Sequence, residues 1–118
     1  MSKCIFCQIV NKKIPAKIIY EDDEVLAFPD INGLAPVHIL IIPKKHIESI
    51  NHLQAEKDEG ALAGKLIMVA QQIAQEQEIA EGGYKLLFRV GKHGEQEVPH
   101  IHLHLIGGAQ LREDVGVA

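Results

Sequence analysis

The chain of 118 residues lacks an excess of positive charge, since its 16 acidic residues outnumber its 12 lysines and arginines and give a net charge of −4. Proteins that bind nucleic acid usually present a basic face, so we expect no nucleic acid partner, although a mononucleotide needs only a local site. The chain also lacks a run of 18 apolar residues, and its first ten residues lack the long apolar core of a signal peptide. We therefore expect a cytoplasmic protein with no membrane partner.

Cysteine is scarce as well, and tryptophan is absent. The only two cysteines, Cys4 and Cys7, form a C-x-x-C pair. A structural disulfide is rare in the reducing cytosol, and a redox pair normally lies at the strand-to-helix turn of a βαβ unit, a pattern that this sequence does not show. The remaining interpretation is half of a metal site, which needs two further ligands from elsewhere in the chain.

The length of the chain predicts one domain over residues 1–118. Its hydrophobic content of 47% and its charged content of 24% are those of an ordinary soluble globular protein. A single core of this size is small, so the fold would benefit from oligomerisation.

The hydrophobic pattern predicts two helices and five strands in an α+β fold, an antiparallel meander sheet with the long helix packed on its inner face. The long helix is indicated by apolar residues at steps of four, three and four, and it is stopped by Gly82-Gly83. In chain order, the expected elements are a short helix within 4–13, two strands within 17–28 joined at Asp22-Asp23, a strand over 37–43, a long helix over 55–80, a strand over 84–90 and a last strand over 100–106.

Three histidines alternate with aliphatic residues in the segment HIHLHLIGG, which runs from His100 to Gly108. In a strand, alternation places His100, His102 and His104 on one face. The outer two would be about 13 Å apart, because same-face residues are separated by roughly 6.5–7 Å. Zinc needs its nitrogen ligands near 2 Å, so each histidine is expected to have its own task. The alternatives are a solvated strand with ordinary histidines and a three-histidine metallohydrolase, which the spacing disfavours.

The segment HIHLHLIGG resembles the signature of the histidine triad (HIT) nucleotide hydrolases and transferases. The resemblance extends to CIFCQIVNKKIPAKIIYEDDEVLAFPDI, APVHILIIPKKHIESI and GYKLLFRV, and it is strongest to the Hint-type nucleoside phosphoramidases. It implies a HIT-like fold and hydrolysis of nucleoside 5′-phosphoramidates or nucleotidyl esters to a purine nucleoside monophosphate. The implied route is a nucleotidyl-histidine intermediate. The alternatives are a dinucleoside polyphosphate hydrolase and a nucleotide-binding or signalling module with incidental turnover.

The resemblance also implies the catalytic residues. His102 would be the nucleophile, with one ring nitrogen free and the other held by a backbone carbonyl on an adjacent element. His104 would contact the phosphate and the leaving group as a general acid; a histidine here favours hydrolysis, because transferase branches tend to carry glutamine. His38 aligns with a fourth histidine and would support the nucleophile, the alternative being an ordinary histidine at a strand end.

The nucleotide-binding residues are implied in the same way. Asp30 matches the carboxylate that accepts ribose hydroxyls, and the backbone N–H groups of 94–98 would cradle the phosphate. The sequence departs from the family at three positions: Arg89 replaces an asparagine, Glu95 a glycine and Glu97 often a serine, so Arg89 can either clamp a phosphate or pair with a nearby glutamate. The remaining phosphate-side residues are Gln96 and Val98, and the apolar walls around the base, or plain core, are Ile5, Phe6, Ile9, Phe28 and Ile31.

The resemblance supplies the missing half of the metal site. It pairs Cys4 and Cys7 with His46 and His100, a Cys₂His₂ set that binds structural zinc in a closed tetrahedron. It also implies a homodimer, joined through the long helix and the strand 84–90 into a ten-stranded sheet. That strand is apolar on both faces, and pairing it at an interface would cover an open sheet edge.

Overall fold

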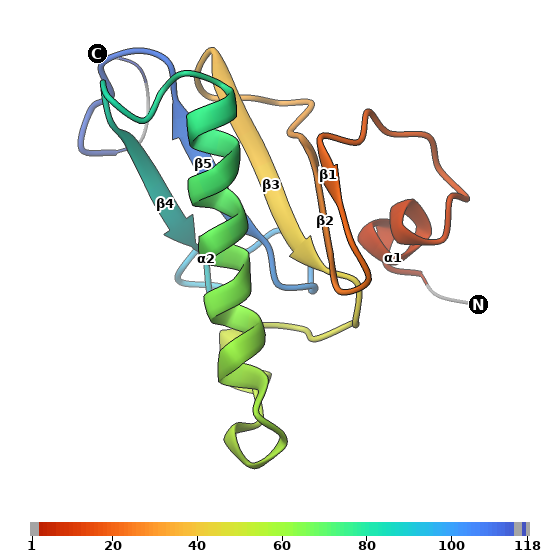
Figure 1. The fold of residues 1–118 in the computed structure, drawn as a ribbon. Coiled ribbons are helices and arrows are strands. Elements are labelled where there is room, and N and C mark those ends of the chain that lie inside the picture. Colours follow the sequence, from red (N-terminus) through yellow and green to blue (C-terminus); the bar gives the residue numbers. More distant parts are fainter. Residues whose placement is uncertain (1–2, 115–116, 118) are drawn as a thin grey trace.

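The computed structural model describes residues 3–114 and 117. Its centre is a five-stranded antiparallel sheet in the order β1-β2-β3-β5-β4, with two helices packed against it (Figure 1). The elements are α1 (Ile5–Val10), β1 (Tyr20–Glu21), β2 (Val25–Pro29), β3 (Val37–Pro43), α2 (Glu59–Glu76), β4 (Tyr84–Phe88) and β5 (Leu103–Gly107), and two short 3-10 turns, Ile50–His52 and Ala55–Lys57, precede α2. The α+β class, the five antiparallel strands and the two helices are as the sequence predicts.

The strand order departs from a strict meander at one place, because β5 lies between β3 and β4. Both neighbours run antiparallel to β5 and are therefore parallel to each other. Parallel strands need a long crossover connection, and α2 supplies it between β3 and β4. The crossover leaves a gap one strand wide, and the returning chain fills this gap with β5.

The long helix is shorter than the predicted span of 55–80. Residues 55–57 form a 3-10 turn, and Asp58 has a left-handed backbone (φ 59°) that interrupts the helical run before α2 begins. At the other end, Glu78 adopts φ 59° and reverses the chain ahead of Gly83. The buried face of α2 consists of Leu66, Val69, Ala70, Ile73 and Ala74.

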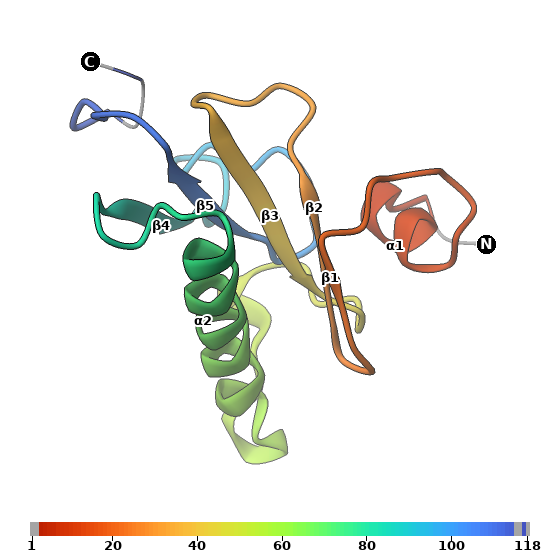
Figure 2. The ribbon, with the colours of Figure 1, turned by 45° about the horizontal axis from the view of Figure 1, so that its top comes forward.

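The sheet carries an apolar core on each face. On one face, α2 packs with Ile39, Ile41 and Leu105. On the other face, Phe6 and Ile9 of α1 pack against the alternate residues of the same strands, such as Leu40. Figure 2 shows α2 and α1 on either side of β1, β2 and β3. Two-sided coverage explains why 37–43 reads as an unbroken apolar run.

The last strand begins later than predicted, at Leu103 rather than at His100. β4 ends at Phe88, which pairs with Leu103, so the residues before Leu103 have no ladder partner on that side. Alternation nevertheless holds through this segment, because Ile101 joins Leu103 and Leu105 in the core beneath α2. The histidines at even positions therefore face the opposite side of the sheet.

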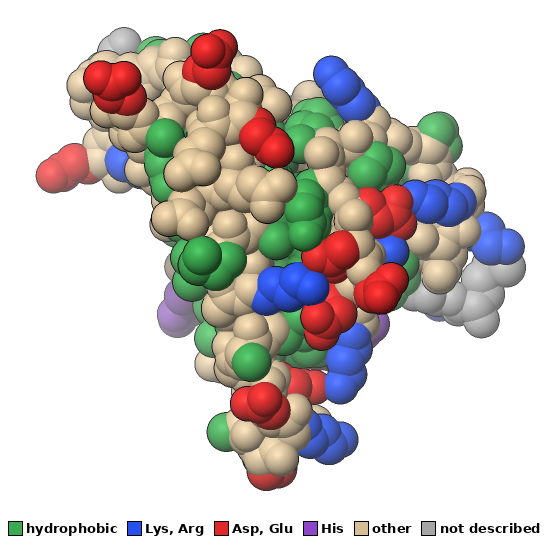
Figure 3. All heavy atoms as spheres, viewed as in Figure 1, with side chains coloured by type: hydrophobic (Ala, Val, Ile, Leu, Met, Phe, Trp, Pro, Cys, Tyr) green, Lys and Arg blue, Asp and Glu red, His purple; other side chains and the backbone are tan. Residues whose placement is uncertain are grey.

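Ion pairs link α2 to the β1–β2 hairpin. Lys65 lies 3.1 Å from Asp22 and 2.9 Å from Glu24, and Figure 3 shows acidic and basic side chains gathered over this region. Asp22 also closes the hairpin turn by accepting the backbone N–H groups of Glu24 and Val25.

Among the described residues, no helix has both the length and the apolar character that a membrane crossing needs.

Candidate active site

A cavity of about 540 Å³ lies on the α1 side of the sheet and brings most of the predicted site residues together. Its lining comes from α1, from β2 and the turn after it, from His38 and Leu40 of β3, from His102 and His104 around the start of β5, and from the segment after β4, in which Val98 packs against the apolar cluster of α1. The predicted residues that line it are Ile5, Phe6, Ile9, Phe28, Asp30, Ile31, His38, Arg89, Glu97, Val98, His102 and His104.

His102 is held as a neutral imidazole with one nitrogen open. Its Nδ1 lies 2.8 Å from the backbone oxygen of His100. A carbonyl can only accept, so Nδ1 carries the proton and Nε2 keeps its lone pair. Burial lowers the pKa of His102, which favours the neutral form at pH 7. The carbonyl belongs to the same segment, two residues upstream, and not to an adjacent element as the sequence suggested.

His104 has the opposite tautomer, and His38 sets it. The backbone N–H of Leu34 donates to His38 Nδ1 at 3.0 Å, so the proton of His38 lies on Nε2. This nitrogen lies 2.9 Å from His104 Nδ1 and donates to it. His104 therefore carries its own proton on Nε2, which is buried and has no hydrogen-bond partner among the described residues. Burial, with smaller contributions from His102 and His38, lowers the pKa of His104 to about 4.

The structure also shows which histidine His38 contacts. His38 contacts His104 and not the nucleophile candidate His102, because the register of β3 and β5 places His38 beside the even-numbered residues at 104 and 106. Asp30 follows β2 and lies 3.6 Å from His38 Nε2. Its other carboxylate oxygen accepts the backbone N–H of Asn32, which leaves the carboxylate at the edge of the cavity.

Two other candidates lie outside the cavity or at its rim. Gln96 does not line the cavity: its side chain donates to the backbone oxygens of Glu48 and Val98 and accepts from the N–H of Gly91. Gln96 thus braces its own loop, since its amide is satisfied by backbone groups. Ile31 lies at the rim with 95% of its surface exposed, and it can form a base wall only when a ligand covers it.

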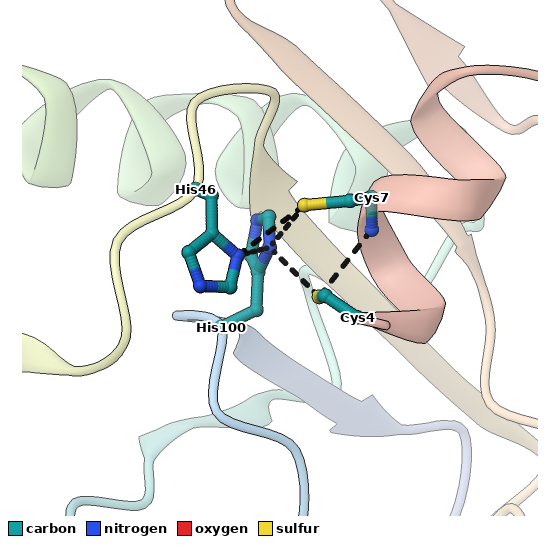
Figure 4. A group of neighbouring side chains, drawn as sticks. All are labelled: Cys4, Cys7, His46 and His100. Atoms are coloured by element: carbon teal, nitrogen blue, oxygen red, sulfur yellow. Dashed lines mark hydrogen bonds between the residues drawn. The ribbon is translucent and has the colours of Figure 1, made fainter. Parts of the chain in front are cut away.

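The four metal-ligand candidates form a compact cluster beside the cavity, and their side chains point toward one another (Figure 4). Nδ1 of His100 lies 3.4 Å from Cys4 Sγ, 3.5 Å from Cys7 Sγ and 3.2 Å from Nδ1 of His46. Cys7 Sγ lies 3.3 Å from His46 Nδ1. Sulfur and nitrogen ligands at the corners of a zinc tetrahedron are about 3.5 Å apart, so these separations match the edges of such a site.

The surroundings of the cluster also suit a metal. His100 Nε2 lies 2.8 Å from the backbone oxygen of Pro43 and donates to it, which leaves Nδ1 unprotonated toward the sulfurs. Metal-binding histidines are commonly oriented by such a bond from the other ring nitrogen. The backbone N–H of Cys7 also points to Cys4 Sγ, at 3.4 Å. The donor set therefore fits zinc.

Comparisons with known proteins agree with this geometry. A family described as "Scavenger mRNA decapping enzyme C-term binding" matches residues 3–113. The purine nucleoside phosphoramidase of Escherichia coli K12 is 48% identical over 107 residues, which cover 91% of this chain and 88% of that protein. Protein HitA of Neisseria gonorrhoeae is 44% identical over 107 residues, 91% of this chain and 97% of HitA. The chain belongs to the histidine triad family.

The solved structures of HIT proteins extend the similarity to three dimensions. The crystal structure of a HIT family hydrolase from Legionella pneumophila matches with a TM-score of 0.90 at 46% identity, over 94% of this chain and 97% of that one. A histidine triad protein from Clostridium difficile matches with a TM-score of 0.90 at 38% identity, over 96% of both chains. The expected family, the HIT fold and a HIT-type hydrolase are thereby confirmed.

Some cavity residues of this HIT protein were missed by sequence reasoning. Leu34 contributes a backbone N–H, and such a group has no signature in the sequence. Leu40 lines the cavity beside His38, and the period of two along 37–43 was a signal that could have found it. Pro29 and Asn32 lie on the turn after β2, where no periodic pattern indicates which residues face inward.

We expect the two kinds of tautomer to be observable directly. At neutral pH, His102 should be the Nδ1–H form, whereas His38 and His104 should be the Nε2–H form, for the hydrogen-bonding reasons above. Long-range ¹H–¹⁵N correlation spectra of uniformly labelled protein distinguish the two forms, and the exposed His93 provides the reference for an imidazole in water. An Nε2–H signal for His102, or an Nδ1–H signal for His104, would contradict the assignment.

Proposed function

We propose that this protein hydrolyses nucleoside 5′-phosphoramidates or related nucleotidyl esters and releases a purine nucleoside monophosphate through a nucleotidyl-histidine intermediate. The observation that carries the proposal is the pair of opposite tautomers in one cavity: a lone pair on His102 Nε2 and a proton on His104 Nε2. A nucleophile and an acid are the two groups that displacement at phosphorus needs. The phosphoramidase relative from Escherichia coli supports the same substrate class.

In the first half of the reaction, His102 Nε2 attacks the α-phosphorus. The bond from phosphorus to the leaving nitrogen or oxygen breaks, and its electron pair stays with the leaving atom, which takes the proton from His104 Nε2. For His104 to donate without becoming an imidazolate, the His38–His104 pair takes up one proton from solvent when the phosphate binds, a state that the negative charge of the phosphate favours. As His104 Nε2 gives up its proton, the proton of His38 Nε2 passes to His104 Nδ1, and the pair becomes neutral until the water of the second half recharges it. In the second half, water attacks the phosphorus, the bond to His102 Nε2 breaks, and the proton of the water returns to His104. The sum is substrate plus water giving nucleoside monophosphate plus amine or alcohol.

The remaining cavity residues have binding roles in this proposal. Asp30 accepts the ribose hydroxyls from the edge of the cavity, and the backbone N–H groups of 94–98 receive the phosphate oxygens. Arg89, Glu97 and Val98 form the phosphate-side wall. The base packs between the apolar side chains from α1 and from the end of β2, namely Ile5, Phe6, Ile9, Phe28 and Ile31.

The charge of the cavity favours this substrate class over a dinucleoside polyphosphate. Three carboxylates line the cavity, those of Asp30, Glu95 and Glu97, and Arg89 is the one lysine or arginine among its described lining residues. A longer phosphate chain brings several further negative charges and would be repelled by this set. A binding module with incidental turnover is the other alternative, and it gives no reason for the opposed histidine tautomers.

His102→Ala should remove the covalent nucleotidyl-enzyme and lower kcat/KM by about a thousandfold or more, because the nucleophile is lost.

His104→Ala should lower the turnover of substrates with amine leaving groups far more than that of substrates with activated leaving groups, which need little protonation. Release of nucleoside monophosphate from an adenosine phosphoramidate, with diadenosine polyphosphate as the competing substrate, is the measurement.

His93→Ala, at an exposed histidine outside the cavity, is the matched control and should retain wild-type rates. Most of the activity surviving in His102→Ala would rule out the nucleophile assignment. Faster turnover of the polyphosphate than of the phosphoramidate would favour the alternative substrate class, and the absence of any turnover would favour a binding module.

We also propose that Cys4, Cys7, His46 and His100 hold one structural zinc ion. The ligand separations support this assignment, and four protein ligands leave no open position for substrate or water. The ion would cross-link α1, which carries part of the base wall, to the segment that carries His102. A zinc–thiolate site is compatible with the cytoplasmic location that the sequence predicts.

Metal analysis of the wild type should give about one zinc per chain, and Cys4→Ser should lose most of it. The melting temperature of Cys4→Ser should fall first and substrate affinity second, while the folded fraction keeps the chemistry of His102. His93→Asn should keep its metal content and its melting temperature. Metal-free wild type with full activity would refute the zinc assignment, and a rapid, reversible loss of turnover on chelation at constant melting temperature would show that the ion is catalytic.

A homodimer through β4 and α2 completes the proposal. β4 is an edge strand, and Leu86 on it has 38% of its surface exposed, while α2 exposes Ile67 and Met68 at 44% and 60%. Pairing two copies of β4 would join two sheets into one of ten strands and cover these side chains.

Light scattering at micromolar concentration should give the mass of a dimer, and Leu86→Glu should shift this mass to that of a monomer. Ile18→Glu, on an exposed residue far from β4 in the sheet order, is the control, and a monomeric wild type would overturn the idea.

A further inference from the structure

The order of elements along the cavity indicates where a leaving group would lie. The base-wall residues come from α1 and β2, His38 from β3, and His102 and His104 from β5 and the segment before it. The next strand in the sheet is β4, and Arg89 follows it directly. If the base occupies the α1 end and the phosphorus lies at the histidines, as in the proposed function on which this inference rests, the group leaving from phosphorus extends toward the end of β4.

Arg89 lines the same cavity as His102. The ladder of β4 and β5 ends where Phe88 pairs with Leu103, and Arg89 is the next residue in the chain. Leu87 pairs with His104 on the cavity face, so alternation places Arg89 on that face as well. Arg89 shares this cavity with His38, His102 and His104, and an arginine can hold phosphate oxygens bidentately.

Glu95 is the partner of Arg89, and the pair is loose. The carboxylate lies 3.8 Å from the guanidinium, and 83% of the Glu95 side chain is exposed. An exposed ion pair at this distance contributes little to stability. A bound phosphate can displace this carboxylate from Arg89, which would leave a negative charge at the β4 end of the cavity.

The backbone at Glu95 is unusual for this residue type. Its φ is 60°, in the left-handed region that glycine adopts at lower cost. The loop is tight here, because a Cβ at the preceding Gly94 would lie 2.5 Å from the backbone oxygen of Val90. A strained non-glycine residue that also lines a cavity is a reason to look for a function of its side chain. The unpartnered Nε2 of His104, buried in the same cavity, independently marks the place where a ligand belongs.

We propose that Arg89 and Glu95 form the leaving-group end of the site, and that Glu95 makes the enzyme prefer leaving amines that carry a second, positively charged group. Arg89 turns from Glu95 to the phosphate of the substrate, and Glu95 then faces the leaving group. During hydrolysis the P–N bond breaks, its electron pair stays on the leaving nitrogen, and that nitrogen takes the proton of His104. The distal ammonium of the leaving amine is unchanged throughout and only contacts the carboxylate.

The test compares two adenosine 5′-phosphoramidates of equal length. One is formed with 1,5-diaminopentane, which ends in an ammonium group, and the other with hexylamine, which ends in a methyl group. At low ionic strength, wild type should prefer the cationic substrate about fivefold or more in kcat/KM, and the preference should shrink as salt screens the charges. Glu95→Gln should bring the ratio close to one, and Glu95→Lys should invert it.

Three further variants separate charge from structure. Glu95→Gly removes the charge and relieves the backbone strain, so it should match Glu95→Gln if the charge decides the ratio. Glu81→Gln, at an exposed glutamate outside the cavity, should keep the wild-type ratio. The affinities of both substrates for His102→Ala, measured by calorimetry with and without Glu95→Gln, give the same comparison without turnover.

An unchanged ratio in Glu95→Gln would overturn the inference. An equal rise in kcat/KM for both substrates in Glu95→Gln would also overturn it, because it would mean that Glu95 only competes with phosphate for Arg89. Charge-dependent binding without hydrolysis by wild type would refute the proposed function and leave the role of Glu95 standing. Hydrolysis of both substrates at the same rate, in wild type and in Glu95→Gln alike, would support the proposed function and refute the role of Glu95.

Discussion

The residue on which the site depends is His100, because three of its groups hold three different parts of the molecule. Its backbone oxygen fixes the proton of His102. Its Nε2 is anchored to the end of β3 through Pro43, and its Nδ1 faces the two sulfurs at the start of α1. Because these contacts are made by one buried residue, the position of α1 and the tautomer of His102 both depend on where the backbone places His100.

The imidazoles of His102 and His104 differ although they lie two residues apart on one face. His102 hydrogen-bonds to a backbone acceptor, whereas His104 receives a proton from a second imidazole whose own tautomer is set by a backbone donor. The orientation of backbone groups therefore produces an asymmetry that the side chains alone do not have. Burial adds the second condition, because it keeps the rings neutral and makes the choice of tautomer meaningful.

Much of this arrangement could be predicted from local patterns. The alternation in HIHLHL indicated the two faces correctly, because a period of two survives even where the ladder has not yet begun at His100. The contact of His38 with His104 could not be predicted, since it depends on the register of β3 against β5, and the two residues lie 66 positions apart. The bonds of Gln96 could not be predicted either, because an amide beside a glycine-bearing loop suits a ligand and a loop brace equally well, and its bond to the backbone of Glu48 joins residues 48 positions apart.

The insertion of β5 between β3 and β4 has a consequence for how the protein comes to be folded. During synthesis, β3, α2 and β4 leave the ribosome before β5 does, and both β3 and β4 then present an unpaired edge. Because pairing across so long a stretch of chain is slow, the sheet closes late, and the two edges that meet β5 are exposed to other chains in the meantime. β5, which brings His104 into the cavity, is thus also the strand that ends this vulnerable stage, so a newly made chain completes the cavity and gains its protection from aggregation in one step.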